Sequence, residues 1–394
     1  MKKLHGVRLA HHKNTENCAS VPLPLPKLVR IPMSMHIGAP CTPAVKPRDT
    51  VLVGQKIGDT DAFMAAPIHS GVSGTVKAIS TYRMSNGRTC PMVEIETDGQ
   101  QTVCPDVCPP TVTDKESFLK AVRESGLVGM GGASFPTHVK LNPKQKVDTL
   151  VINAAECEPL LYTDYYVMKR AMERIASGAE TVMEAAGIPN GYLGVKAHTA
   201  KRLGLSHGDA VSAHVKVHIL PDVYPMGDEI ILIYQVLGRV VTPGSLPLSA
   251  GVLVFNAETL YNVDRAVKEG LPVTEKWVTI GGKVARPVSL KVPVGTSVAE
   301  LFAHLGVSVP EGCVVIDGGP AMGPVINPDT AVITKTTKGL LILPDDIPAI
   351  TSKLSQNRAV MVHASSNCCQ CTLCSEMCPR ALIGYPLRPH KIVR

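Results

Sequence analysis

The feature that most constrains this chain is a run of cysteines close to its C-terminal end. Four of them share the spacing C-x2-C-x2-C-x3-C-P: Cys368, Cys371, Cys374 and Cys378. Bacterial ferredoxins use this spacing to hold [4Fe–4S] clusters through thiolate ligands. Structural zinc sites instead combine two separated Cys or His elements, and no second element follows here. We therefore expect an iron–sulfur electron-transfer site with these four cysteines as ligands.

The same spacing points to a second cluster. In ferredoxins the last cysteine of such a run, before proline, binds the neighbouring cluster. Sixteen residues follow Cys378 here, and none is a cysteine. We expect the chain to be a fragment of a longer two-cluster protein, whose gene continues past Arg394 with another such run. The alternative is one cluster that takes Cys378 or Cys369 as its fourth ligand; otherwise Cys369 is a bystander.

Composition favours a cytoplasmic oxidoreductase. A length of 394 residues is enough for two to four domains, and 45% of the residues are apolar and can fill the domain cores. Seven of the twelve cysteines lie outside the run and form no small-scaffold disulfide pattern, which favours a reducing compartment. No signal-peptide run follows Met1-Lys2-Lys3-Leu4-His5, and no stretch has the ~18 apolar residues of a membrane span. The net charge of +7 is dispersed and aromatic residues make up 4%, so nucleic-acid binding is not expected.

The patterns predict an α/β multidomain fold. In chain order we expect an N-terminal region with a barrel-sandwich hybrid, an α/β core, a β-grasp module of SLBB type and a cysteine-bearing helical segment, at residues 1–110, 111–270, 271–345 and 346–394. Residues 32–98 contain short strand runs punctuated by glycine and proline, as in biotinyl or lipoyl domains. The turn at 59–63 lacks the lysine that carries a swinging arm. We therefore interpret this part as a docking or structural domain.

Residues 111–270 alternate strands with helices, as crossover units do. Thr113-Asp114-Lys115-Glu116 is a capping-box signature, and its helix is predicted to end near Gly126. A buried strand is predicted at 149–153, a helix at 165–186 with Gly187 as its stop, and further strands at 192–197 and 215–220. Strand character returns from residue 276, with a short helix at 298–305.

A glycine-rich segment, 126–140, carries the first candidate for ligand binding. Closely spaced glycines let backbone N–H groups approach an anion, and Lys140 can add a cation for a phosphate. The ordinary dinucleotide fingerprint G-x-G-x-x-G is absent, and glycine clusters also mark plain turns. Two further segments favour a binding site: 153–159, at the carboxyl end of a predicted strand, and 224–229.

These segments, together with 255–263, occur in the same order in the NADH-oxidising flavoprotein subunit of respiratory complex I, which the chain resembles. The motifs at 36–40 and 66–70 and the cysteine run narrow the resemblance to the RnfC and PduS family. Its members are the C subunit of the Rnf ferredoxin–NAD complex and the cobalamin reductase of propanediol-utilisation microcompartments. The N-terminal sandwich matches the Rnf type, whereas 220–225, 335–341 and 378–384 look more like PduS.

The resemblance implies a binding site for FMN and NAD(H). Its expected residues are Gly129, Gly131, Gly132, Phe135, Lys140, Asn153, Glu156, Glu158, Gly227, Glu229, Asn256 and Thr259. The glycine loop and Lys140 would hold the FMN phosphate and ribityl chain, and the two asparagines, Glu156 and Thr259 would contact the flavin. Phe135 and Glu158 would face the nicotinamide nucleotide, and Gly227 and Glu229 would close the site. No side chain is required as a general acid or base.

Three departures from the family pattern are Ser134 in place of glycine, Met130 in place of a frequent arginine, and Phe255 in place of asparagine. Ser134 would crowd a close backbone approach. Other interpretations stay open: Glu156 and Glu158 as helix caps, His138 as a surface residue, and Cys157 as a small buried side chain.

The function implied is an NADH-oxidising or NAD-reducing subunit that passes electrons through FMN and [4Fe–4S] clusters, two in the full-length protein, to a partner. Expected partners are an electron-acceptor protein or a corrinoid enzyme, together with other Rnf-type subunits or microcompartment proteins. The chain would then lie in the cytoplasm, on the inner membrane face through its partners, or inside a microcompartment. A PduS-like cobalamin reductase is the alternative. A flavin-free, cluster-bearing scaffold subunit, with Ser134 as its sign, is a further one.

Overall fold

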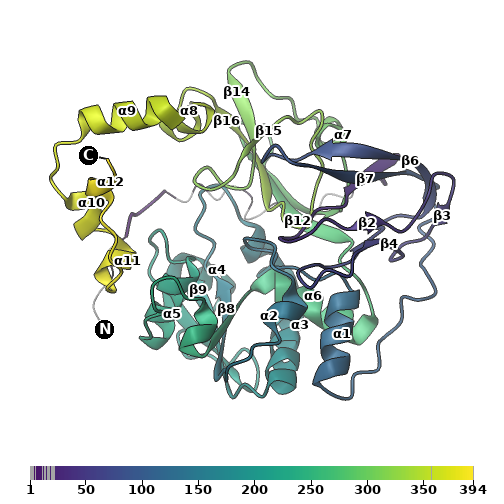
Figure 1. Ribbon diagram of the computed structural model, residues 1–394, viewed down its shortest axis with the longest axis horizontal. Coiled ribbons are helices and arrows are strands. Elements are labelled where there is room, and N and C mark those ends of the chain that lie inside the picture. The colour runs from purple at the N-terminus through teal and green to yellow at the C-terminus, as the bar shows by residue number, and fades with distance from the viewer. Residues whose placement is uncertain are drawn as a thin grey trace.

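The computed structural model describes residues 4, 6–10, 12, 15, 18, 23–355 and 357–393. Residues 1–3, His5 and Arg394, which entered the expectations about a leader and a longer gene, lie outside the described residues. Figure 1 shows an α/β core with two β-rich modules above it and a C-terminal segment, in yellow, along one side. This arrangement confirms the predicted α/β multidomain class.

The N-terminal module consists of two small antiparallel sheets with the strand orders β1-β7-β6-β3 and β2-β4-β5. The strands are β1 Leu28–Pro32, β2 Thr42–Pro43, β3 Thr50–Val51, β4 Lys56–Asp59, β5 Ile68–His69, β6 Gly74–Arg83 and β7 Thr89–Thr97. Side chains from both sheets, among them Ile31, Ile57 and Ile68, are fully buried in one core. The predicted sandwich is therefore present.

The turn at 59–63, which lacks a lysine, is attached to the core. Arg123 Nη2 lies 2.9 Å from Asp59 Oδ1, and Lys56 Nζ lies 2.5 Å from Glu124 Oε2. Arg123 and Glu124 belong to the last turn of a core helix. The first ion pair holds Asp59 at the start of the turn, and the second holds the adjacent strand β4 to the same helix. The docking or structural role of this module stays a prediction.

The core is a parallel sheet with the strand order β10-β9-β8-β11. Its strands are β8 Thr149–Ala154, β9 Asn190–Lys196, β10 Val215–Leu220 and β11 Val252–Asn256. The helices of this part are α1 Lys115–Glu124, α2 Thr137–Lys140, α3 Thr163–Ala186, α4 Ala197–Leu203, α5 Glu229–Leu237, η1 Pro247–Ala250 and α6 Ala257–Glu269. Leu150 and Ile152 pack on the face covered by α3 and α6, whereas Val151 packs with α5 on the other face. Helices therefore cover both faces of the sheet, as crossover units require.

Helices α3 and α6 cross at very short range. A Cβ atom on Gly178 of α3 would lie 2.0 Å from the Leu260 carbonyl oxygen of α6. Glycine at position 178 allows this approach. The N-terminal turns of both helices lie at the same edge of the sheet because the helices follow the parallel strands β8 and β11. The predicted end of α3 is confirmed, since Gly187 caps it with a left-handed φ of 64°.

The capping box of α1 was predicted one residue too early. Its N-cap is Asp114 rather than Thr113, and the N3 residue is Ser117 rather than Glu116. Ser117 N donates to Asp114 Oδ1 at 2.8 Å, and Asp114 N donates to Ser117 Oγ at 3.1 Å. A carboxylate accepts a stronger hydrogen bond from a backbone N–H than a threonine hydroxyl does, which explains the shift.

The β-grasp module is a mixed sheet with the strand order β13-β12-β16-β14-β15 and one helix, α7 Val298–His304. Its strands are β12 Glu275–Gly282, β13 Val288–Pro293, β14 Cys313–Asp317, β15 Val325–Ile326 and β16 Gly339–Pro344. Strands β12 and β16 run parallel at its centre. The predicted β-grasp module is therefore present.

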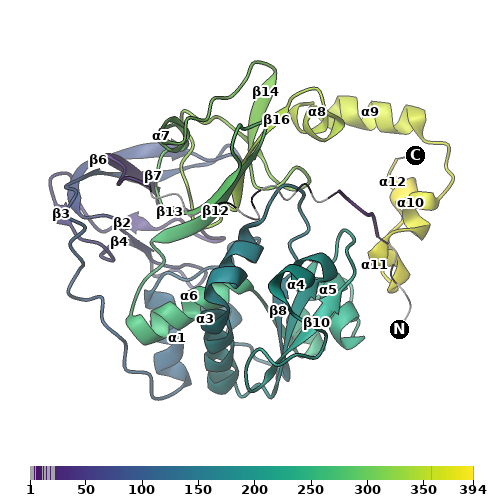
Figure 2. The same cartoon turned by 180° about the vertical axis from the view of Figure 1, so that it is seen from behind.

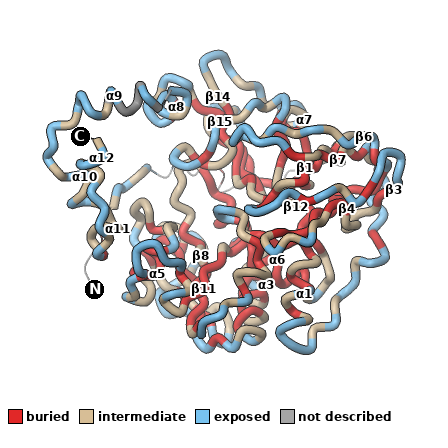
Figure 3. The backbone as a smooth tube through the Cα atoms, viewed as in Figure 1, coloured by how far each residue is buried: buried red, intermediate tan, exposed pale blue. Residues whose placement is uncertain are grey.

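The C-terminal segment leaves β16 and returns to the core. Its helices are α8 Pro348–Leu354, α9 Asn357–Asn367, α10 Leu373–Glu376, α11 Pro379–Leu382 and α12 Pro389–Ile392. Figures 1 and 2 both place α11 beside α5, and Figure 3 shows that most of the described segment is exposed. Ile383, which is 7% exposed, packs into the core under α5. None of the helices in the described part of the chain is long and apolar enough to cross a bilayer.

A buried lysine joins three of these parts. Lys335, 1% exposed, donates to the carbonyl oxygens of Pro67 in the sandwich and Gly126 in the core, at 2.8 and 2.7 Å. The buried imidazole of His69 lies beside this lysine, and the half-buried imidazole of His138 lies near Arg123. Burial, and then the charge of Lys335, lowers the pKa of His69 to about 3. Burial, and then the charge of Arg123, lowers the pKa of His138 to about 4.

We predict that acidification destabilises this junction. Both histidines are neutral in the folded chain but titrate with a pKa of 6.5 once unfolded. The unfolded state therefore binds more protons below about pH 6.5, so stability is fully present above that pH and falls as the pH drops further. For His69 alone, urea titrations should show a loss of about 2 kcal/mol between pH 7 and pH 5. His69→Gln should flatten this dependence, and an unchanged slope would contradict the prediction.

The backbone of Ser134 has a conformation that is unusual for a residue with a side chain. Its φ of 54° lies in the left-handed region, and its carbonyl oxygen accepts a 3.3 Å hydrogen bond from Ile37 N in the sandwich. A Cβ atom in that region is strained. Ser134→Gly should therefore raise the free energy of unfolding by about 0.5–1 kcal/mol in denaturant titrations. Ser134→Ala keeps the Cβ atom and serves as the control, so an equal gain in both variants would argue against strain.

Candidate functional site

The candidate site lies where the strand order of the core reverses. The chain proceeds from β8 to β9 to β10 in one direction, and β11 then returns to the other side of β8. Asn153 and Asn256 are register partners at the carboxyl ends of β8 and β11. Ligands of open α/β sheets bind at this kind of switch point. The two predicted asparagines therefore stand side by side at the edge where a ligand is expected.

The protein itself fixes the orientation of both asparagine side chains. Asn153 Nδ2 donates to the Gly227 carbonyl oxygen at 2.9 Å, and Asn153 Oδ1 accepts from Ala155 N at 3.2 Å. Asn256 Oδ1 caps α6 by accepting from Glu258 N at 3.0 Å. Their first task is thus to hold the neighbouring backbone in place. Gly227, predicted to close the site, is brought to the switch point in this way.

The glycine loop crosses directly above Asn256. Gly129 N donates to the Phe135 carbonyl oxygen at 2.9 Å, which closes the loop, and Met130 N donates to Thr259 Oγ1 at 3.1 Å. Thr259 is completely buried, so it anchors the loop from below. A Cβ atom on Gly131 would lie 2.9 Å from Asn256 Cβ. Glycine is therefore required at this position for close approach.

The top of the loop has the properties of an anion site. Gly131 and Gly132 are exposed, and a Cβ atom on Gly132 would have no neighbour within 4 Å. In the part of the chain that the structure describes, their N–H groups donate to no protein acceptor. Exposed backbone N–H groups of this kind suit a phosphate.

Lys140 and Glu229, both predicted site residues, meet beside the loop. Lys140 Nζ lies 3.3 Å from Glu229 Oε1 and 5.1 Å from the centroid of the Phe255 ring. The glutamate side chain is 46% exposed, so this ion pair is screened and weak. An incoming phosphate can therefore compete for the ammonium group.

The two glutamates of the segment 153–159 have different partners. Glu156 Oε1 accepts from Thr163 N at 3.1 Å in the first turn of α3, so the helix-cap interpretation holds for it. Glu158 accepts instead from Ala321 N and Met322 N, at 3.0 and 2.9 Å, in the β-grasp module. Its role toward a nicotinamide nucleotide stays a prediction.

Cys157 is more than a space-filling side chain. Gly227 N donates to its sulfur at 2.9 Å, and Cys157 lines a small pocket with Lys196, Asp222 and Tyr224. The thiol therefore helps to position the segment that carries Gly227.

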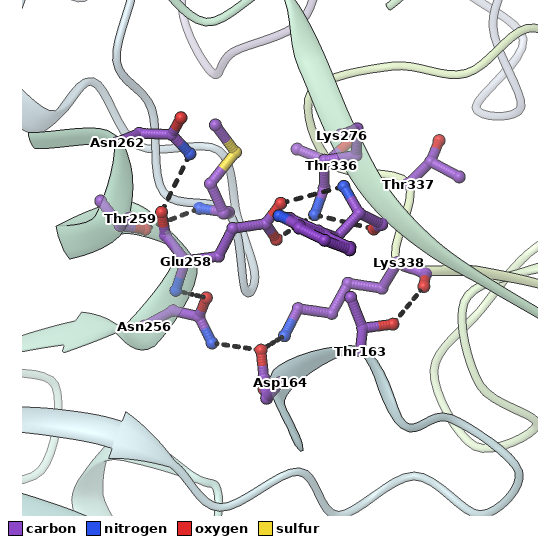
Figure 4. A network of polar contacts seen from close by, with 12 residues as sticks. Thr163, Asp164, Asn256, Glu258, Thr259, Asn262, Lys276, Thr336, Thr337 and Lys338 are labelled. Atoms are coloured by element: carbon purple, nitrogen blue, oxygen red, sulfur yellow. Dashed lines mark hydrogen bonds and ion pairs between the residues drawn. The ribbon is translucent and has the colours of Figure 1, made fainter. Parts of the chain in front are cut away.

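Sequence reasoning missed a buried ionic network between the core and the β-grasp module, drawn in Figure 4. Lys338 Nζ lies 2.5 Å from Asp164 Oδ1, and Lys276 is paired with Glu258 where both side chains are at most 1% exposed. Burial alone would lower the pKa of Lys338, but the Asp164 charge holds it above its usual value. The only sequence signal is that two lysines flank apolar strand runs.

The cysteine segment is docked close to this site. Arg380 Nη2 lies 2.5 Å from Asp228 Oδ2, and Asp228 is the N-cap of α5 between Gly227 and Glu229. Tyr385 also donates its hydroxyl to the Val241 carbonyl oxygen at 2.7 Å. Together these contacts hold the chain just after the last cysteine against α5.

The four predicted cluster ligands lie on this segment as free thiols: Cys368, Cys371, Cys374 and Cys378. Within the described residues, no group of three or more His, Cys, Asp or Glu side chains is arranged to hold a metal ion. Four thiols at this sequence spacing on a largely exposed segment are nevertheless the donor set that a cluster requires. The ligand assignment therefore stays a prediction based on spacing.

Family models match three parts of the chain. They are the RnfC barrel sandwich hybrid domain at residues 2–100, the Nuo51 FMN-binding domain at 122–265, and the SLBB domain at 277–323. The second range contains the glycine loop, both asparagines and the GDE segment 227–229. The core is accordingly an FMN-binding domain.

Among curated proteins, the C subunit of the Na+-translocating ferredoxin:NAD+ oxidoreductase complex of Acetobacterium woodii is 35% identical over 374 residues, which cover 92% of this chain and 82% of the relative. The cobalamin reductase PduS of Citrobacter freundii is 42% identical over 284 residues, which cover 72% of this chain and 62% of the relative. The chain thus spans less than two thirds of the length of that relative.

Among solved structures, a chain of an NAD+-reducing [NiFe]-hydrogenase in the air-oxidised state aligns with a TM-score of 0.46 at 20% identity, covering 64% of this chain and 49% of that one. A likeness at this level is too distant to support an inference about function. The family models and the match to the A. woodii protein are sufficient: this chain belongs to the RnfC/PduS family of flavin-domain electron-transport proteins.

Proposed function

We propose that this chain exchanges hydride with NAD(H) and passes single electrons through FMN and a [4Fe–4S] cluster to a partner protein. FMN converts two-electron hydride chemistry into one-electron steps, which are the only steps a cluster can take. The chain's own residues would bind and orient these groups, and none of them need transfer a proton.

The observation that carries the proposal is the ion pair between Arg380 and Asp228. It joins the segment of Cys378 to the N-terminus of α5. The residue before Asp228 is Gly227, whose carbonyl oxygen is bound by Asn153 at the switch point. One chain therefore holds its cysteine segment next to its flavin-domain edge, as a short electron path requires.

The residues at that edge have complementary tasks. The exposed N–H groups of Gly131 and Gly132 and the ammonium group of Lys140 would bind the FMN phosphate. Asn256 supports the loop from below, and Asn153 holds Gly227. In this arrangement the flavin ring would lie along the carboxyl ends of β8 and β11.

The kind of partner is inferred from the relatives. The alignment to the A. woodii protein, which covers 92% of the chain, and the N-terminal sandwich favour an Rnf-type complex whose other members accept the electrons. The second candidate is a microcompartment cobalamin reductase that serves a corrinoid enzyme, favoured by the 42% identity to PduS. Reduction of a corrinoid by the purified chain with NADH would separate the two.

Lys140→Ala should weaken FMN binding about ten- to hundredfold, because a charge-assisted hydrogen bond contributes roughly 1.5–3 kcal/mol. Gly131→Val should also release flavin, since its side chain would collide with Asn256. Fluorescence titration of the apoprotein with FMN measures both effects. Lys144→Ala removes an exposed lysine nearby and is the control. Wild-type affinity in the first two variants would refute the site.

Arg380→Ala should slow electron transfer from flavin to cluster, because electron tunnelling falls steeply with distance. Reduction of the flavin by NADH should proceed as in the wild type. Anaerobic stopped-flow absorbance separates the two steps, and iron analysis checks that the cluster is retained. Arg380→Lys should restore part of the rate. Failure of NADH to reduce the flavin of the wild-type chain would refute the proposed function itself.

A further inference from the structure

The β-grasp module places a largely buried cation at the edge of the candidate flavin site. Lys338 stands just before β16, and its ammonium group reaches Asp164 in the first turn of α3. The two side chains are 15% and 5% exposed. The Lys338 carbonyl oxygen also accepts from Thr163 Oγ1 at 2.7 Å, so both ends of the residue are fixed to α3. Figure 4 shows these contacts together.

The same carboxylate oxygen orients Asn256. Asp164 Oδ1 accepts from Lys338 Nζ and, at 3.1 Å, from Asn256 Nδ2. Asn256 Nδ2 also donates to the Asn153 carbonyl oxygen at 3.4 Å, and Asn256 Oδ1 accepts from Glu258 N, so the carboxylate is one of three contacts that hold the amide group, and the shorter of the two on Nδ2. Without its cation, Asp164 would be an uncompensated buried charge, so its place beside Asn256 would be energetically unfavourable.

Asn256 in turn supports the glycine loop. An added Cβ atom on Gly131 would lie 3.0 Å from Asn256 Cγ and Nδ2, so the amide is in direct van der Waals reach of the loop. A rotation of this amide would therefore displace the loop or leave a gap beneath it. A continuous set of contacts runs from Lys338 through Asp164 and Asn256 to Gly131.

We propose that Lys338 is a positioning residue for the flavin site: the β-grasp module sets the conformation of the glycine loop through Asp164 and Asn256. The inference rests on the proposed function in that it names FMN as the ligand of the loop. The coupling itself is a property of the protein and exists before any ligand binds. It also gives the β-grasp module a task in the site.

The test compares Lys338→Met with Lys291→Met. Lys291 lies on β13 of the same module and pairs with Glu275 at 2.6 Å, and its side chain is 31% exposed. Hydrogen exchange of the apoprotein should accelerate in peptides covering 126–140 for Lys338→Met and stay unchanged for Lys291→Met. FMN affinity should fall about tenfold in the first variant only. Lys338→Arg should restore both quantities.

Two results would overturn the inference. One is unchanged exchange of the 126–140 peptides in Lys338→Met. The other is a general increase of exchange across the core that matches a loss of global stability, since a merely structural residue would give that pattern. The double variant Asp164→Asn, Lys338→Met keeps an acceptor for Asn256 without a buried charge, so it should recover part of the loop protection. If the wild-type chain binds no FMN, the proposed function fails while the exchange measurements still decide the role of Lys338.

Discussion

The arrangement of this molecule depends on burying lysines of the β-grasp module inside its neighbours. Lys276 pairs with Glu258, Lys338 pairs with Asp164, and Lys335 donates to two carbonyl oxygens. Removing an ammonium group from water is costly, and a partner charge compensates only when the geometry is good. Such contacts add little net stability but penalise any other packing of the modules, so they specify how the modules meet.

The three lysines contact different parts of the molecule. Lys335 reaches the sandwich and Gly126 at the start of the glycine loop, whereas Lys276 and Lys338 reach the first turns of α6 and α3. Since α3 and α6 follow the parallel strands β8 and β11, those two turns lie at the same edge as the two asparagines. The β-grasp module is therefore a support for the flavin domain as well as a neighbour of it.

Much of the core could be predicted because runs of apolar residues mark its strands and a glycine marks the end of its long helix. The run 149–153, the stop at Gly187 and the strand 215–220 all depend on local residue chemistry, and the structure has them. The glycine loop and the asparagines could also be found, because their segments are distinctive. The partners of Lys276, Lys338 and Glu158 could not, since each contact joins residues in different modules and no local pattern encodes it. The capping box was misplaced because two adjacent polar residues compete for one cap.

The strand order has a consequence for how the site is made during synthesis. Asn256 is bonded to the carbonyl oxygen of Asn153, which lies 103 residues earlier, so the edge between β8 and β11 can close only after most of the core has been translated. Contacts between such distant residues form late in folding. If Lys338 also supports the loop, the pocket matures only when the β-grasp module has left the ribosome. Cofactor insertion is then a step that follows assembly of the modules, and a nascent chain that stalls before β16 would expose an unfinished flavin edge.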